Sequence, residues 1–294
     1  MERDDRALGG QVPAKVQELF TYLLLHRERP VSREAVAALL WRDTYSGQPK
    51  KHLRQALWQL QSIVDAHAAG QPQVLLVEAD WVHVNPACGF WLDVAVFEQA
   101  FDATSGITGD RLDPGRAQVL AAASELYRGD LLEGCYEDWC LFERERLQNA
   151  YLAMLDKLMV RCQATGAYEI GIGYGERVLR IDRAHERTHR RLMRLRYLDG
   201  DRTAALAQYE HCEAALRDEL GVRPARATTS LYEQIRADRL DPDAPAFAGG
   251  EPVDVVDAPS TRELEQLRDV LLDLRHQADV GLEAIREALR QQRD

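Results

Sequence analysis

The most constraining feature of this sequence is a self-similarity at a spacing of 34 residues in its second half. Helix hairpins of the tetratricopeptide type repeat at this period and bury their faces by stacking. The positions that coincide after the shift are Leu158-Met159 with Leu192-Met193, Gly166 with Gly200, and Tyr168 with Arg202. Residues 94–240 are therefore predicted to form a tetratricopeptide-like helical repeat domain, with helices at 144–156 and 228–239 completing the stack.

The first 93 residues follow a different pattern, in which three helices precede two short strands. The first helix follows Pro13 and repeats apolar residues at i, i+3 and i+4, and Ser32 is a candidate cap for the second helix. A third amphipathic helix follows Pro49. Residues 74–77 and 81–84 are predicted to be the strands of a hairpin. This order predicts a winged helix-turn-helix domain over residues 1–93.

The outward face of the third helix carries the side chains that best suit DNA recognition. Because Leu53, Leu57, Leu60 and Val64 are predicted to face the core, the remaining face is polar and basic. Lysine and arginine bind phosphate, arginine also reads guanine, and amide side chains read adenine. The predicted DNA-binding residues of this helix are Lys50, Lys51, Arg54, Gln55, Trp58, Gln61 and Ser62. Trp58 has a second interpretation, in which it packs against the helical domain and closes this face to DNA.

The charge distribution favours a local nucleic-acid contact. The net charge of −11 argues against a chain that coats nucleic acid along its whole surface. Residues 1–95, however, hold 10 basic and 11 acidic side chains, and no acidic residue lies between Tyr45 and Val64. The cationic segment therefore coincides with the third helix.

The hairpin is predicted to contribute less than the third helix. His83 is a candidate minor-groove contact, while the turn at 78–80 contains Glu78 and Asp80, which repel phosphate. Trp81 is predicted to belong to the core.

Two short motifs resemble catalytic or ligand-binding signatures. The string HERTH at 185–189 matches the HExxH zinc motif, but it lies among arginines that would repel a divalent cation. The string GIGYG at 171–175 lacks the dinucleotide-binding spacing, and Gly171 and Gly173 are interpreted as close helix contacts in the repeat. No catalytic residue, metal site or cofactor is predicted, and the five cysteines are expected to be free thiols.

The C-terminal region is predicted to be a linker at 241–259 and a helix at 260–294. The linker contains four prolines and only acidic charges. The helix keeps coiled-coil spacing from Leu264 to Ala288, which suits either a homodimer seam or docking back onto the same chain. The lack of a long apolar run or a signal-peptide pattern predicts a cytoplasmic protein without a membrane span.

Several longer motifs resemble those of the SARP-type antibiotic-regulatory activators, which combine an OmpR-like winged helix with a bacterial transcriptional activator domain. The motifs that carry this resemblance are KKHLRQALWQLQ, YRGDLLEG, WCLFERERL and ELGVRPA, within residues 11–240. About a dozen residues precede the first helix, where members of the family carry a small antiparallel sheet.

The resemblance implies a mainly α transcription regulator that binds double-stranded promoter DNA and contacts RNA polymerase. The alternative function is a helical interaction or ligand-sensing module whose winged helix does not bind DNA. Exposure of the third helix favours the first function, and its burial under the repeat domain would favour the second.

Overall fold

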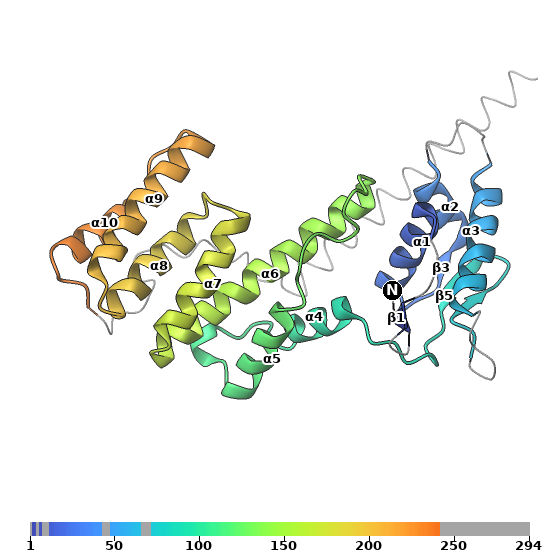
Figure 1. The fold of residues 1–294 in the computed structure, drawn as a ribbon, viewed down its shortest axis with the longest axis horizontal. Helices are drawn as coiled ribbons and strands as arrows, with labels where there is room; N and C mark the ends of the chain where they lie inside the picture. Colours follow the sequence, from blue (N-terminus) through green and yellow to red (C-terminus); the bar gives the residue numbers. More distant parts are fainter. Residues whose placement is uncertain (1, 4–5, 8–11, 43–47, 66–71, 242–294) are drawn as a thin grey trace, which may run out of the picture. The chain divides into compact units, whose positions relative to one another are not determined.

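A computed structural model describes residues 2–3, 6–7, 12–42, 48–65 and 72–241 (Figure 1). The chain divides into two units, residues 1–240 and 241–294. Apart from Asp241, the predicted linker and C-terminal helix lie outside the described residues. The described chain is mainly helical, as predicted.

Three helices and two small sheets form the N-terminal third. In chain order they are β1 (Glu2–Arg3), β2 (Arg6–Ala7), α1 (Ala14–Leu25), β3 (Val31–Ser32), α2 (Arg33–Leu40), α3 (Pro49–Val64), β4 (Leu75–Val77) and β5 (Trp81–Val84). Strands β1 and β2 pair antiparallel ahead of α1, where the sequence leaves only about a dozen residues. Ser32 caps α2 as predicted, since its Oγ accepts a hydrogen bond from the Ala35 amide at 3.5 Å.

The second sheet has the order β3-β5-β4 and is antiparallel throughout. Val82 on the central strand pairs with Val31 on one side and Val77 on the other. The predicted hairpin is therefore present, and the strand β3 adds an edge that the sequence pattern did not reveal. Apolar side chains of this sheet pack with α1, α2 and α3 in one core.

The remaining described elements are helical. They are α4 (Asp93–Asp102), the 3-10 turn η1 (Gly109–Arg111), α5 (Pro114–Ser124), α6 (Asp138–Thr165), α7 (Tyr168–Ile181), α8 (Glu186–Leu198), α9 (Arg202–Leu220) and α10 (Arg226–Arg236). Helices α6 and α7 pack side by side, as do α8 and α9 (Figure 1).

The structure confirms the 34-residue register of the repeat. Helices α7 and α9 begin at Tyr168 and Arg202. Gly166 and Gly200, at the ends of the preceding helices, both have positive φ, of 73° and 89°. Glycine reaches this conformation without the steric cost of a Cβ, so it is the residue that each hairpin turn requires.

The glycines of α7 correct the interpretation of GIGYG. A Cβ on Gly171 would lie 2.9 Å from the Cβ of Cys162, so Gly171 is a close helix contact as predicted. Gly173 is not such a contact, because a Cβ there would meet nothing within 4 Å. Gly175 is the tighter site, since its Cβ would lie 2.6 Å from Cδ2 of Leu192.

Helix α6 is longer than the predicted helix at 144–156. It begins at Asp138, and its first turn places Trp139 and Cys140 in the core formed by α1–α3 and the second sheet. The ring of Trp139 packs edge-on against Tyr22 of α1, with 5.4 Å between centroids. The N-terminal turn of α6 thus joins the core of the first 93 residues to the helical repeat.

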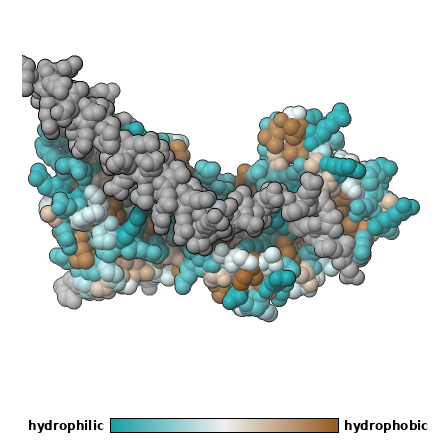
Figure 2. Space-filling view, turned by 180° about the vertical axis from the view of Figure 1, so that it is seen from behind, coloured by the Kyte–Doolittle hydropathy of each residue, from teal (hydrophilic) through white to brown (hydrophobic). Residues whose placement is uncertain are grey.

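The described surface is mostly polar. Figure 2 shows hydrophilic side chains over much of the coloured surface, with smaller hydrophobic patches between them. Within the described part of the chain, every helix is too short or too polar to cross a lipid bilayer.

Candidate nucleic-acid interface

Helix α3 is amphipathic in the way that the sequence predicts. Pro49 occupies the first turn, where a missing backbone N–H costs no helical hydrogen bond. The predicted apolar stripe is buried, with Leu53, Leu57, Leu60 and Val64 each at most 4% exposed. Burial of this stripe fixes the rotation of the helix and so determines which side chains face outward.

The opposite face of α3 is open to solvent. Six of the seven predicted residues of this helix are exposed and one is half-buried: Lys50, Lys51, Arg54, Gln55, Trp58 and Ser62 are exposed, and Gln61 is half-buried. Trp58 is 69% exposed, so the described helical repeat does not cover this face. The packing interpretation of Trp58 is therefore wrong for the described part of the chain.

The two lysines at the start of α3 differ in their surroundings. The Nζ atom of Lys50 lies 2.8 Å from a carboxylate oxygen of Glu34 on α2, and both side chains are exposed. The hydrogen bond to Glu34 raises the pKa of Lys50, and the same bond lowers the pKa of Glu34. Among the described residues, Lys51 and Arg54 have no ion-pair partner. Their charges are therefore the ones most available to an anionic ligand.

The hairpin strands alternate between the core and solvent. Val82 and Val84 of β5 are buried, whereas Trp81 is 48% exposed. The prediction that Trp81 belongs to the core is wrong, because the two-residue period of a strand that buries positions 82 and 84 turns position 81 outward.

His83, the predicted hairpin contact, is engaged within the protein. Its Nε2 lies 2.9 Å from the backbone carbonyl oxygen of Arg27 at the end of α1. A carbonyl only accepts, so the imidazole nitrogen donates this bond. The bond ties β5 to the segment after α1 and leaves His83 half-buried.

Arg33 is a residue of this region that the sequence pattern did not single out. Its guanidinium donates to the carbonyl oxygens of Glu78 and Ala79, at 2.7 and 3.2 Å. Its backbone amide also donates to Asp80 at 2.8 Å. Arg33 thereby holds the acidic turn of the hairpin against the start of α2, an interaction between residues too far apart in sequence to be anticipated.

The HERTH string has a structural role in the repeat. Glu186 accepts hydrogen bonds from the Ala225 amide, at 2.7 Å, and from the Thr228 hydroxyl, so it fixes the start of α10. His189 is buried between the carbonyl of Arg183, 2.8 Å away, and Gln208, 2.7 Å away. Burial lowers the pKa of His189, which favours the neutral ring. No group of three or more potential metal ligands occurs among the described residues.

Comparisons with known proteins agree with this architecture. The model of the bacterial transcriptional activator domain matches residues 92–236. No curated protein matches the chain. Among solved structures, the chain is similar to EmbR of Mycobacterium tuberculosis in a complex with a low-affinity phosphopeptide, with a TM-score of 0.55 and 18% identity.

The similarity to EmbR covers 81% of this chain and 62% of that chain, so this chain spans less than two thirds of the length of EmbR. At this identity the match shows a shared fold. The family model matches the part of the chain that contains helices α4 to α10, where the predicted repeat lies. Residues 92–236 of the chain therefore resemble the bacterial transcriptional activator domain.

Proposed function

We propose that this protein is a DNA-binding transcription regulator whose helices α1–α3 and hairpin β4–β5 form a winged helix, with α3 as the recognition helix. One observation carries the proposal. The apolar face of α3 is buried while its basic and amide face is exposed. An exposed helix of this composition fits the major groove of B-DNA, which admits an α-helix.

The side chains of α3 divide into two roles. Lys51 and Arg54 supply unpaired positive charge for phosphate, and Lys50 can exchange Glu34 for phosphate. Gln55 lies one helical turn after Lys51 on the exposed face and can pair with an adenine edge. The indole of Trp58 offers apolar surface to sugar or to a thymine methyl group.

The hairpin has a supporting role in this proposal. His83 is bound to the backbone of Arg27, and the turn is acidic, so neither favours phosphate. The helical repeat at 92–236 supplies surface for protein partners, and the family resemblance points to RNA polymerase as one of them.

The proposal predicts how two charges of α3 affect binding. In the variant Lys51→Gln/Arg54→Gln, affinity for duplex DNA should fall by about tenfold or more at 0.1 M salt. The slope of log affinity against log salt should decrease by about 1.8, since each phosphate contact contributes about 0.9. Fluorescence anisotropy with a labelled 30-base-pair duplex of mixed sequence, between 50 and 300 mM salt, measures both quantities.

Arg217→Gln/Arg223→Gln is the matched control. It also removes two positive charges from exposed side chains, but Arg217 lies in the last turn of α9 and Arg223 lies just after that helix. It should keep the slope of the unchanged protein. An unchanged slope in the α3 variant would refute α3 as the interface, and no salt-dependent binding by the unchanged protein would favour the interaction-module alternative.

A further inference from the structure

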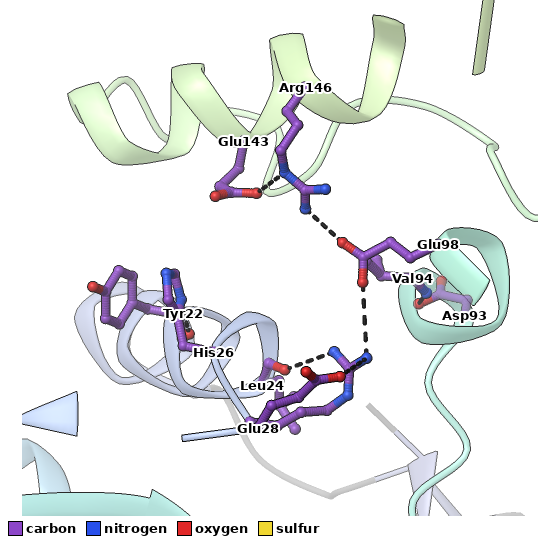
Figure 3. A network of polar contacts seen from close by, with 10 residues as sticks. Tyr22, Leu24, His26, Glu28, Asp93, Val94, Glu98, Glu143 and Arg146 are labelled. Carbon is purple, nitrogen blue, oxygen red and sulfur yellow. Dashed lines mark hydrogen bonds and ion pairs between the residues drawn. The ribbon is translucent and has the colours of Figure 1, made fainter. Parts of the chain in front are cut away.

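We propose that Glu98 of α4 is a positioning residue that ties the hairpin β4–β5 to the activator domain through Arg27. Glu98 lies between two arginines from different elements (Figure 3). One carboxylate oxygen is 2.6 Å from Arg146 of α6, and the other is 3.8 Å from Arg27, just after α1. The proposal rests on the proposed function only in treating the hairpin as part of the DNA-binding unit.

The ionic cluster is better shielded from solvent than a typical surface ion pair. The side chains of Arg27 and Glu98 are 25% and 24% exposed. Glu143 is 13% exposed and lies 2.8 Å from Arg146. Burial opposes the charge of Arg146, but the hydrogen bonds to Glu98 and Glu143 outweigh this effect and raise its pKa. Arg146 is 41% exposed, and the largely exposed Glu28 adds a further ion pair with Arg27 at 3.9 Å. Salt therefore screens the charges of Arg27, Glu98 and Glu143 less than those of fully exposed pairs.

Arg27 connects this network to the hairpin. Its backbone carbonyl accepts the hydrogen bond from His83 of β5. Its guanidinium donates to the carbonyl of Leu24 at 3.2 Å, which closes the end of α1. The side chain and the backbone of one residue thus contact the activator domain and the hairpin respectively. Any change in how Glu98 holds the guanidinium is transmitted to the carbonyl that anchors His83.

The ion-pair network lies at a cleft, and this location bears on how the hairpin is held to the activator domain. A cleft of about 1420 Å³ lies here, and Arg27, Glu98 and Arg146 line it. The ion pair of Arg27 with Glu98 joins residues on the two sides of this cleft. The second connection, at the first turn of α6, combines the hydrophobic insertion of Trp139 with the ion pairs Lys15–Glu137 and Arg42–Asp138. In this proposal the Glu98 network adds a second point of attachment, away from the first turn of α6.

Hydrogen–deuterium exchange of the full chain tests this assignment without DNA. Glu98→Gln keeps the size of the side chain and removes its charge. Amides of residues 26–30 and 81–84 should exchange about twofold to fivefold faster, as expected for loss of a partly shielded ion pair. Glu233→Gln is the matched control, because Glu233 pairs with Arg236 on α10 and the change also removes one helical carboxylate. It should leave both segments unchanged.

Two further variants separate coupling from general destabilisation. Glu98→Asp keeps the charge and should restore most of the protection. Arg27→Gln/Glu98→Gln should exchange no faster at 81–84 than Arg27→Gln alone, because both changes interrupt the same connection. Unchanged exchange at 81–84 in Glu98→Gln, or additive effects in the double variant, would overturn the proposal. Exchange in α8 and α9 should remain unchanged throughout, and faster exchange there would mean that the variant loosens the whole fold and that Glu98 has no specific positioning role.

DNA binding provides a second readout. Glu98→Gln should weaken binding to the 30-base-pair duplex about twofold to fivefold without changing the salt slope, because Glu98 itself does not contact phosphate. Lys51→Gln/Arg54→Gln changes the slope. If the exchange result holds and no variant affects DNA binding, the proposed function fails while the coupling through Glu98 stands.

Discussion

Two glycines of α7, two positions apart, differ in whether a neighbouring helix leaves room for a side chain. Gly173 is exposed, and a Cβ there would meet nothing within 4 Å. Gly175 is buried, and a Cβ there would lie 2.6 Å from Leu192 and 2.8 Å from Met159. Substitutions at Gly173 therefore test the low helix propensity of glycine, and substitutions at Gly175 test its role in close packing.

Gly173→Ala should raise the free energy of unfolding by about 0.5–1 kcal/mol, because alanine loses less conformational entropy than glycine in a helix. Gly175→Ala should lower it by about 1–3 kcal/mol, since the added methyl group overpacks the contact with Leu192. Urea unfolding followed by circular dichroism measures both changes. Stabilisation by Gly175→Ala would contradict the close approach of α7 and α8.

The burial of individual side chains was predictable from the sequence where a single helical period determines which face of the helix is buried. The four apolar residues of α3 set the helix rotation, so the exposed face followed from them. The prediction that Trp81 belongs to the core is wrong because the strand period buries Val82 and Val84 and turns position 81 outward. The bond from His83 to Arg27 joins residues 56 positions apart, and no local pattern encodes it.

At the scale of elements, the repeat was the most predictable part of the fold. The 34-residue shift located the starts of α7 and α9 because both turns need a glycine with positive φ. The start of α6 was not predictable in the same way. Its first turn is stabilised by Trp139 packing on Tyr22, a contact with a helix more than a hundred positions earlier.

The turn η1 also depends on a contact with residues that are distant in sequence. A Cβ on Gly109 would lie 2.2 Å from the backbone oxygen of Lys157, so the turn rests directly on α6. Glycine is required there by a distant neighbour, and the local sequence only marks a turn. Contacts of this kind set how the elements between α4 and α6 pack, and the sequence alone does not reveal them.

At the scale of the whole molecule, we propose that the predicted C-terminal helix at 260–294, which lies outside the described residues, sets the oligomeric state. Its heptad pattern from Leu264 to Ala288 suits a homodimer, which would match paired DNA half-sites. Residues 1–240 form a unit with its own core, so a chain that ends at Leu240 is a suitable comparison. Light scattering should give a dimer mass for the full chain and a monomer mass for the shorter chain. Equal monomer masses would instead favour docking of the helix onto its own chain.

Site-specific photo-cross-linking tests whether the exposed face of α3 contacts DNA. A benzophenone amino acid replaces Trp58, which is 69% exposed on α3, or Val119, which is 57% exposed on α5. Both variants of the full chain are irradiated with the same labelled 30-base-pair duplex at 0.1 M salt. We predict a protein–DNA cross-link from position 58 and none from position 119. No cross-link from position 58, or equal yields from both positions, would contradict this contact.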